Sequence, residues 1–222
     1  WRSLMNCVQA LATSEPLQAR YSWSKDLLRH VTNLRQNADV VHVEHLRGAR
    51  YGLSPEFDRV SSVPTVWDSV DCISALFEQA ASRRRDGVGR LINRVELART
   101  RRYEGWLVSQ FERVLVSSSV DRNSLLGLSR AIQSETSVSE RAVTVLSNGV
   151  DLDYFTPADD VRQADTLVFS GKMSYHANET AALRLVRRIM PLVWAGRPDT
   201  RVVLAGLDPG PAVQALTADA RV

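Results

Sequence analysis

A glycine and a lysine directly follow a short apolar run in the last third of the sequence. The run is Thr166–Ser170; Gly171 and Lys172 come next, and Asn178 follows a few residues later. Glycine lets the backbone approach a ligand closely, and the N-terminal end of a helix offers unpaired N–H groups with partial positive charge. A lysine adds a full charge. These residues predict a diphosphate-binding turn in which Asn178 caps the next helix. The alternative is a surface lysine in an ordinary turn.

Acidic residues and a histidine follow two apolar runs in the first half of the sequence. Glu44 and His45 end one run, and Asp68 and Asp71 come after the next. In an open parallel sheet, ligands bind beyond the carboxyl ends of the strands. The four side chains are therefore candidates for a second ligand site. The alternatives are residues that only cap the edge of the sheet and, for Asp71, the N-cap of a helix through Ile73.

Two pairs of residues have some likeness to metal motifs. His42 and His45 are close in sequence, but on a strand they point to opposite faces and cannot converge on one ion. Asp151 and Asp153 form an Asp-x-Asp pair inside a segment with turn chemistry. We therefore expect no metal site at either pair.

Strand-like and helix-like segments alternate and must position these residues. The expected strands are residues 39–44, 63–67, 113–117, 142–145, 166–170 and 201–206. Residues 1–38 are expected to be helical, with Ser24 as the cap of a helix that carries Leu27 and Leu34 on its apolar side. This alternation predicts an α/β fold with parallel sheets.

For two of the connecting helices, the sequence predicts either the N-cap residue or the side that faces the sheet. Asp121 is expected to cap the helix after the third strand. In the helix after Asn178, the residues expected to face the sheet are Ala182, Leu185, Val186 and Ile189.

A long arginine-rich helix is expected between the second and third strands. Its apolar stripe consists of Val88, Leu91, Ile92, Val95, Ala98 and Trp106. The arginines lie largely off that stripe and are Arg83, Arg84, Arg85, Arg90, Arg94 and Arg101. This pattern is typical of a helix with a packed apolar side and a solvated charged side. A functional alternative is contact of residues 83–101 with anionic lipid headgroups. Nucleic acid is not expected, because no aromatic residues interleave with the arginines.

The segment after residue 145 divides the sequence. Asn148-Gly149 is a turn signal, since both residues tolerate positive φ, and Pro157 ends regular structure before a polar stretch. A new strand and the glycine turn follow. The predicted organisation is a first domain of residues 1–146, a linker of residues 147–165 and a second domain of residues 166–222.

The bulk composition sets the limits of these interpretations. The chain has 222 residues, 44% of them hydrophobic, and a net charge of +3, which is too small for a general polyanion binder. Lys25 and Lys172 are the only lysines. Cys7 and Cys72 form no Cys-x-x-Cys pair and indicate a reducing cytosol. The sequence contains no apolar run long enough to span a bilayer and no signal-peptide pattern.

The linker and the glycine turn resemble segments of a known enzyme family. Asn148-Gly149-Val150-Asp151, followed by Phe155-Thr156-Pro157, resembles the interdomain segment of glycosyltransferase family 4, which has the two-Rossmann-domain GT-B fold. Residues 167–179, Leu-Val-Phe-Ser-Gly-Lys-Met-Ser-Tyr-His-Ala-Asn-Glu, are similar to sugar transferases of PEP-CTERM/exosortase exopolysaccharide systems. The likeness extends from about Pro16 to Val222.

The resemblance implies an activity. It implies transfer of a sugar from a nucleotide-sugar donor to a lipid-linked or polysaccharide acceptor, with retained configuration and no metal cofactor, in bacterial envelope or exopolysaccharide synthesis. In relatives, a basic residue at the position of Lys172 contacts the donor diphosphate, and a second basic residue follows near the position of Asn178. Many relatives also place a histidine near the acceptor sugar, about where Val70 stands. The implied location is the cytoplasm or the inner face of the membrane.

The resemblance also implies that segments are missing at both ends. The sequence starts with Trp1, and the family's Glu-x7-Glu motif and nucleobase pocket would lie beyond Val222. Residues 1–146 would then be a partial acceptor-side domain and residues 166–222 the start of the nucleotide-sugar-binding domain. We expect such a fragment not to turn over. Two alternatives stay open: a nucleotide-sugar epimerase of the same fold, and a non-enzymatic membrane-surface module that uses the arginine-rich helix.

Overall fold

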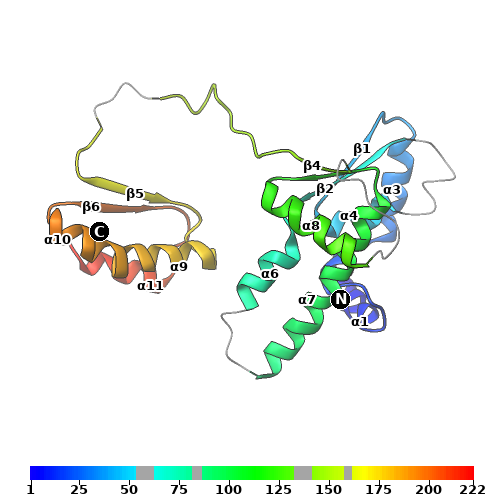
Figure 1. Ribbon diagram of the computed structural model, residues 1–222, viewed down its shortest axis with the longest axis horizontal. Helices are drawn as coiled ribbons and strands as arrows, with labels where there is room; N and C mark the ends of the chain where they lie inside the picture. Colours follow the sequence, from blue (N-terminus) through cyan, green and yellow to red (C-terminus); the bar gives the residue numbers. More distant parts are fainter. Residues whose placement is uncertain (54–62, 82–86, 133–141, 158–161) are drawn as a thin grey trace. The chain divides into compact units, whose positions relative to one another are not determined.

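The computed structural model describes residues 1–53, 63–81, 87–132, 142–157 and 162–222, with the side chains of these residues except Arg2, residues 79–81 and residues 87–90. The chain divides into two compact units, Trp1–Val150 and Asp151–Val222 (Figure 1). This division falls inside residues 147–165, the segment in which the sequence places a linker. The arginines at positions 83–85 and the side chains of Val88 and Arg90 lie outside the described part.

A parallel sheet forms the centre of the first unit. Its strands are β1 (Val41–Glu44), β2 (Thr65–Val70), β3 (Arg113–Val116) and β4 (Val143–Val145). They lie side by side in the order in which the chain forms them, and every neighbouring pair is parallel. The predicted α/β class with parallel strands is confirmed, although β2 runs farther toward its carboxyl end than the expected strand of residues 63–67.

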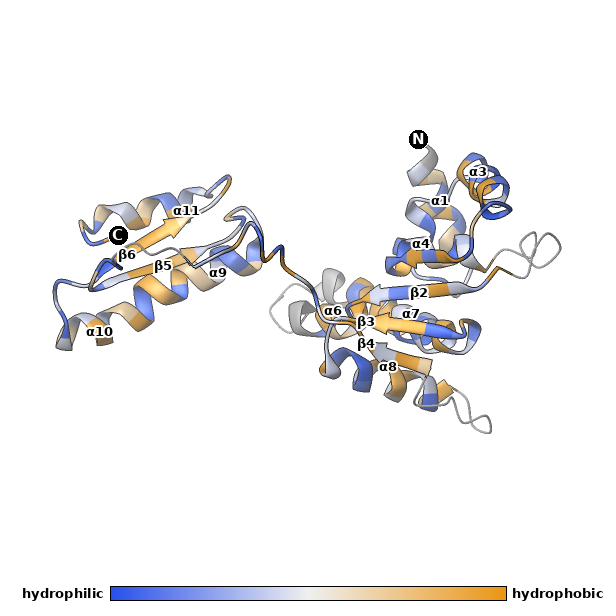
Figure 2. Ribbon diagram, turned by 90° about the horizontal axis from the view of Figure 1, so that it is seen from above, coloured by the Kyte–Doolittle hydropathy of each residue, from blue (hydrophilic) through white to orange (hydrophobic). Residues whose placement is uncertain are grey.

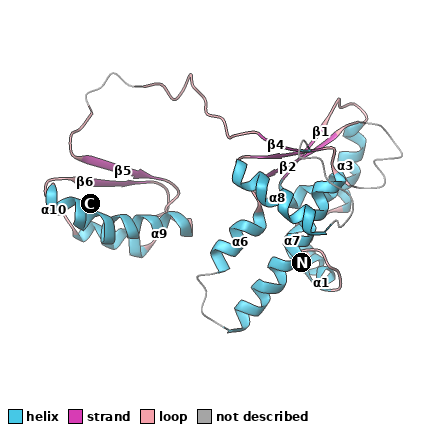
Figure 3. Ribbon diagram, in the orientation of Figure 1, coloured by secondary structure: helices cyan, strands magenta, loops and turns pink. Residues whose placement is uncertain are grey.

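One face of this sheet is buried. Val43, Trp67, Val114 and Val143 are register partners across the four strands, and all are at most 7% exposed. Every crossover advances by one strand in the same direction, and right-handed crossovers of this kind place the connecting helices on one face. Figures 1 and 3 show the helices of the unit below the strands. The other face carries side chains that are exposed or half-buried, among them His42 and Asp68.

The helices that connect the strands build the core against Trp67. They are α4 (His45–Gly52), α6 (Ile73–Ala81), α7 (Gly87–Gln110) and α8 (Ser119–Ile132). Gly105 lets α7 and α8 touch, because a Cβ there would meet the Leu128 carbonyl oxygen at 2.7 Å. The fully buried Leu107 and Leu125 fill the space between these helices and the sheet.

Three shorter helices precede the sheet: α1 (Arg2–Leu11), α2 (Leu17–Tyr21) and α3 (Lys25–Arg35). Ser24 caps α3 as predicted, since its hydroxyl accepts a hydrogen bond from the Leu27 N–H at 3.4 Å. The Tyr51 hydroxyl accepts from the Ser24 N–H at 2.9 Å and donates to the Ser22 carbonyl at 3.0 Å. These bonds fix the start of α3 against α4.

The prediction that Asp71 caps the next helix is wrong. The first N–H groups of α6 donate to a carboxylate from α7: Ile73 to Glu104 Oε1 at 2.7 Å and Ser74 to Glu104 Oε2 at 3.1 Å. Asp71 instead accepts from the Ser117 hydroxyl at 3.3 Å. A glutamate in the middle of a helix gives no local signal of such a role, because the helix that it caps is 31 residues away in sequence.

The prediction that Asp121 caps α8 is also wrong. The helix starts at Ser119, and the Ser118 hydroxyl accepts a hydrogen bond from the Asp121 N–H at 3.2 Å. The carboxylate of Asp121 bonds back to that hydroxyl and accepts from the Cys72 N–H at 2.9 Å. Asp121 thus joins the start of α8 to the start of α6.

The apolar stripe predicted for the long helix faces solvent. In α7, Leu91, Ile92 and Val95 are 64%, 58% and 48% exposed, and Ala98 is exposed as well. The buried side of α7 carries Tyr103 and Leu107 together with the polar Thr100 and Glu104. Spacing alone could not separate the two sides, because the buried polar groups find partners only in the folded unit.

The second unit is a smaller parallel α/β arrangement. Strands β5 (Thr166–Ser170) and β6 (Arg201–Ala205) pair in parallel, and the crossover between them contains α9 (His176–Arg184) and α10 (Met190–Gly196). The short helix α11 (Pro211–Gln214) follows β6. Figure 2 shows both strands largely in the hydrophobic colours.

A π-helical turn separates α9 from α10 and changes which side chains are buried. It spans Leu185–Ile189 and precedes Pro191, whose missing N–H cannot make the α-helical bond to residue 187. Ala182 and Val186 are buried as predicted, whereas Ile189 is 43% exposed. The prediction for Ile189 is wrong because the wider turn rotates it away from the sheet.

An aspartate makes the turn at the start of the second unit. The Asp151 carboxylate accepts from the N–H groups of Asp153 and Tyr154, both at 3.0 Å. The Asp-x-Asp pair therefore performs turn chemistry, as predicted. Asn148 and Gly149 do not adopt positive φ, so the turn predicted at that dipeptide is wrong in position.

Candidate functional site

The carboxyl edge of the first sheet holds two residues in an unusual backbone conformation. His45, directly after β1, has φ of 61°, and Val70, at the end of β2, has φ of 62°. For a β-branched residue such as valine this left-handed conformation is strained. Strain of this kind clusters at functional sites, where the surrounding structure holds it in place.

Hydrogen bonds hold the strained end of β2. The Val70 N–H donates to Asp68 Oδ1 at 2.9 Å, and the Val70 carbonyl accepts from the Ser117 N–H at 2.7 Å. The Asp71 N–H donates to the Ser69 carbonyl at 2.7 Å. An irregular register between β2 and β3 falls between Asp68 and Val70. The carboxylate of Asp68 therefore holds the backbone at Val70 in its strained conformation.

Asp68 lies inside β2, on the exposed face, and not beyond the strand as the sequence suggested. Its Oδ2 is 3.2 Å from Nε2 of His42 in β1. The sequence pattern singles out His42 only as a possible metal ligand. Strand alternation could have placed His42 and Glu44 on one face, but the pairing of β1 with β2 was needed to bring His42 to Asp68.

The predicted residues of this edge are only partly brought together. Glu44 is the register partner of Asp68, and Glu44 Oε1 is 3.7 Å from Nε2 of His45. Glu44 and His45 have side chains that are 64% and 51% exposed. Asp71 points toward the end of β3, where its carboxylate meets Ser117. Glu44 is thus beside Asp68 in the sheet and near His45, whereas Asp71 belongs to the neighbouring strand end.

A buried acidic group lies behind this edge. Glu104 is fully buried, and burial raises the pKa of its carboxyl, while hydrogen bonds from Ser74 and Ile73 act in the opposite direction. Cys72 lies 3.8 Å from Glu104, and burial with the nearby carboxylate raises the pKa of its thiol to about 11. A thiol with that pKa stays protonated at neutral pH, so Cys72 is not a candidate nucleophile.

The second unit brings Gly171, Lys172 and Asn178 together in one turn. Asn178 lies inside the first turn of α9, and its amide donates to the Lys172 carbonyl at 3.1 Å. The prediction that Asn178 caps the helix is therefore wrong; Tyr175 occupies that position. A Cβ on Gly171 would lie 2.8 Å from Asn178 Nδ2, so the glycine is needed for this bond.

A second glycine meets the first across the two strand ends. A Cβ on Gly206, which follows β6, would lie 1.6 Å from the Gly171 carbonyl oxygen. The Gly171 N–H donates to the Ala205 carbonyl at 3.0 Å, and the Met173 N–H donates to the Leu207 carbonyl at 2.9 Å. The turn after β5 and the loop after β6 are thus joined backbone to backbone. The expected strand of residues 201–206 includes Gly206, but no pattern in the sequence indicates this contact.

The Lys172 side chain is exposed at this turn. Among the residues that the structure describes, no carboxylate forms an ion pair with its ammonium. Glu179 also lies in the first turn of α9 and adds a negative charge, but its carboxylate is directed toward Gly210. The turn can offer an exposed cation and a helix start to an anionic ligand.

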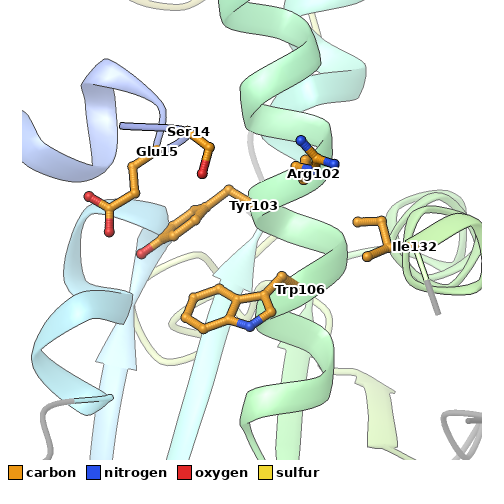
Figure 4. A pocket seen from close by; sticks show the side chains of 6 residues that line it. All are labelled: Ser14, Glu15, Arg102, Tyr103, Trp106 and Ile132. Atoms are coloured by element: carbon orange, nitrogen blue, oxygen red, sulfur yellow. The ribbon is translucent and has the colours of Figure 1, made fainter. Parts of the chain in front are cut away.

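A pocket of the first unit lies away from these residues. This pocket, of about 350 Å³, is lined by Ser14, Glu15, Arg102, Tyr103, Trp106 and Ile132 (Figure 4). Arg20 and Arg50 both pair with the Glu15 carboxylate. Burial and the nearby Glu15 raise the pKa of Tyr103 to about 12. None of the predicted site residues lines this pocket.

Comparison with known proteins adds no assignment. No protein-family model matches the chain, and no curated protein matches it significantly. In the described part of the chain, no group of three or more His, Cys, Asp or Glu side chains is placed to hold a metal ion. The same residues include no helix that is long and apolar enough to cross a bilayer.

Proposed function

We propose that this chain binds a nucleotide sugar through its second unit and belongs to a GT-B-type glycosyltransferase. The observation that carries the proposal is the glycine contact at the carboxyl edge of β5 and β6, beside the exposed Lys172. Ligands of open parallel sheets bind at such edges. The resemblance of residues 147–157 and 167–179 to glycosyltransferase family 4 supplies the substrate class.

In this proposal the residues of the turn have separate roles. Gly206 lets the Gly171 carbonyl approach the end of β6, and Gly171 leaves room for the Asn178 amide. Asn178 fixes the turn through the Lys172 carbonyl, and the Lys172 ammonium contacts the donor diphosphate. Catalysis then rests on stabilising the charge that grows on the diphosphate as the sugar leaves, not on a side-chain nucleophile.

The first unit would hold the acceptor, a glycan or a lipid-linked intermediate. Exposed carboxylates are suited to accept hydrogen bonds from sugar hydroxyl groups. Glu44 and His45 are the exposed candidates, whereas Asp68 and Asp71 act mainly by shaping the strand ends. The two free thiols, Cys7 and Cys72, agree with a cytoplasmic enzyme.

Calorimetric titration with a panel of nucleotide sugars, nucleoside diphosphates and nucleoside monophosphates tests the proposal. We expect saturable binding of the diphosphates and weaker binding of the monophosphates, because the turn is proposed to contact the diphosphate. Equal binding of both classes, or binding to none, would contradict it. An epimerase of the same fold would share the donor binding, so conversion of the bound sugar without any acceptor would favour that alternative.

A further inference from the structure

The outer side of α7 combines exposed apolar residues with arginine. Leu91, Ile92 and Val95 are about half or more exposed, and Ala98 continues the same stripe. Arg94 and Arg101 lie along one side of the stripe, and Arg102 follows Ala98 by one helical turn. We call these residues the α7 outer face: Leu91, Ile92, Arg94, Val95, Ala98, Arg101 and Arg102.

The acidic residues of α7 do not reach this face. Glu96 turns inward, where its carboxylate accepts from the Leu17 N–H at 2.6 Å. Glu104 is buried, and its carboxylate accepts a hydrogen bond from the Ile73 N–H at the start of α6. The one acidic partner among the described side chains is Glu78 of α6, which pairs with Arg101 at 2.9 Å in an exposed ion pair. The α7 outer face therefore presents cations around an apolar stripe.

A second exposed apolar surface adjoins α7 at α1. On α1 the exposed apolar residues are Leu4, Met5, Val8 and Leu11, each at least 53% exposed. The guanidinium of Arg99 in α7 donates to the Leu11 carbonyl at 3.3 Å, which fixes the end of α1 against α7. Each of the two helices thus carries several exposed apolar residues, which is more than the scattered exposed side chains of an ordinary surface.

We propose that the α7 outer face docks on an anionic lipid surface. Apolar side chains can enter the headgroup region, while arginines beside them reach the lipid phosphates with their long side chains. A neutral apolar partner would leave Arg94 and Arg102 without compensating charge, whereas an anionic bilayer supplies it. The sequence indicates lipid contact of residues 83–101 only as an alternative, through arginines that lie largely off the apolar stripe. In the structure, Leu91, Ile92 and Val95 of that stripe are exposed as well. This inference goes beyond the proposed sugar transfer and does not depend on it.

Vesicle sedimentation of the full chain tests the inference. The vesicles are phosphatidylcholine alone or phosphatidylcholine with phosphatidylglycerol. We expect the wild-type chain to prefer the anionic vesicles, and the pair Leu91→Gln and Val95→Gln to lower that binding by about tenfold or more. The pair Arg94→Gln and Arg102→Gln is expected to lower binding to anionic vesicles by about tenfold and to leave binding to neutral vesicles unchanged.

Matched controls carry the same substitutions at other exposed helical positions. Val120→Gln with Leu192→Gln replaces residues that are 72% and 78% exposed, and Arg187→Gln with Arg188→Gln removes two exposed arginines of the second unit. Both control pairs are expected to keep wild-type vesicle binding, and circular dichroism melts verify the folding of every variant. Absence of wild-type binding to anionic vesicles, or equal losses in test and control pairs, would overturn the inference. A wild-type dimer that Leu91→Gln and Val95→Gln convert to a monomer, without vesicle binding, would assign the face to a second copy instead.

Discussion

The carboxyl edges of the two units are built in opposite ways. In the second unit, the strand ends meet through backbone atoms, because Gly206 has no Cβ to collide with the Gly171 carbonyl oxygen. In the first unit, side chains hold the edge: Asp68 fixes the strained Val70, and Asp71 meets Ser117. The backbone edge carries the exposed Lys172, whose charge suits a phosphate, whereas a carboxylate edge offers acceptors for hydroxyl groups. The contrast supports the proposed donor and acceptor sides.

The largest expected effect tests the backbone edge. Gly206→Ala places a Cβ 1.6 Å from the Gly171 carbonyl oxygen, so the strand ends must separate. We expect the free energy of unfolding of the second unit to fall by about 3 kcal/mol or more, measured by urea denaturation. Gly196→Ala is the control, since a Cβ at that position meets nothing within 4 Å. Similar small losses in both variants would show that the edge does not need the glycine.

The next effect concerns Glu104, the buried carboxylate that holds the start of α6 in the first unit. Glu104→Ala leaves the N–H groups of Ile73 and Ser74 without acceptors in a buried place, and we expect a loss of about 2–4 kcal/mol in the free energy of unfolding. Glu112→Ala, at an exposed position of the same unit, is expected to change stability by less than about 0.5 kcal/mol.

Glu104 also predicts a pH dependence. Burial raises its folded-state pKa above the ordinary 4.5, so the unfolded chain releases the proton first as pH rises. The contribution of Glu104 to the free energy of unfolding is therefore largest below about pH 4.5. It decreases as the pH rises through the folded-state pKa. In Glu104→Gln this decrease is expected to disappear. Denaturant melts of both proteins across the acidic and neutral range measure it, and identical slopes would exclude Glu104 as the cause.

The fold was more predictable from the sequence than the site. The apolar run of Thr166–Ser170 is a strand with the predicted bounds, since a short run ended by a glycine turn leaves few alternatives. The Gly171 and Gly206 contact could not be predicted, because it depends on how β5 pairs with β6. For the same reason, the pairing of His42 with Asp68 required the register of β1 and β2.

The orientation of α7 shows a second limit of sequence reasoning. The residues Leu91, Ile92 and Val95 have the spacing of a core stripe, yet they are exposed. Glu104 looks like a surface residue, yet it is fully buried because α6 begins beside it. Hydrophobic spacing assigns the packed side of a helix only where polar residues do not find buried partners elsewhere in the fold.

A moderate effect on nucleoside-diphosphate affinity tests the role of Lys172 in the proposed donor site. Lys172→Ala is expected to weaken nucleoside-diphosphate binding by about tenfold to a hundredfold, since a hydrogen bond to a charged group is worth about 1.5–3 kcal/mol. Lys172→Arg is expected to restore part of the affinity, and the melting temperature is expected to stay nearly unchanged. Lys25→Ala removes the other lysine, which is also exposed, and serves as the control in the same titration. Wild-type affinity in Lys172→Ala would remove the proposed donor contact.

The smallest effect concerns the strain at the first edge. Val70 has φ of 62°, a conformation that costs an L-residue about 1–2 kcal/mol and glycine almost nothing. Val70→Gly removes that strain but also frees the unfolded chain, so we expect a net gain of only about 0.5 kcal/mol in the free energy of unfolding. The control Val8→Gly, on the exposed side of α1, is expected to cost about 0.4 kcal/mol, because that position is helical and glycine has a lower helix propensity than valine. Opposite signs in these two denaturation experiments would show that the edge holds Val70 in strain. A loss at Val70 as large as at Val8 would show that the strand end is relaxed, and the argument for an acceptor site from backbone strain would then fail.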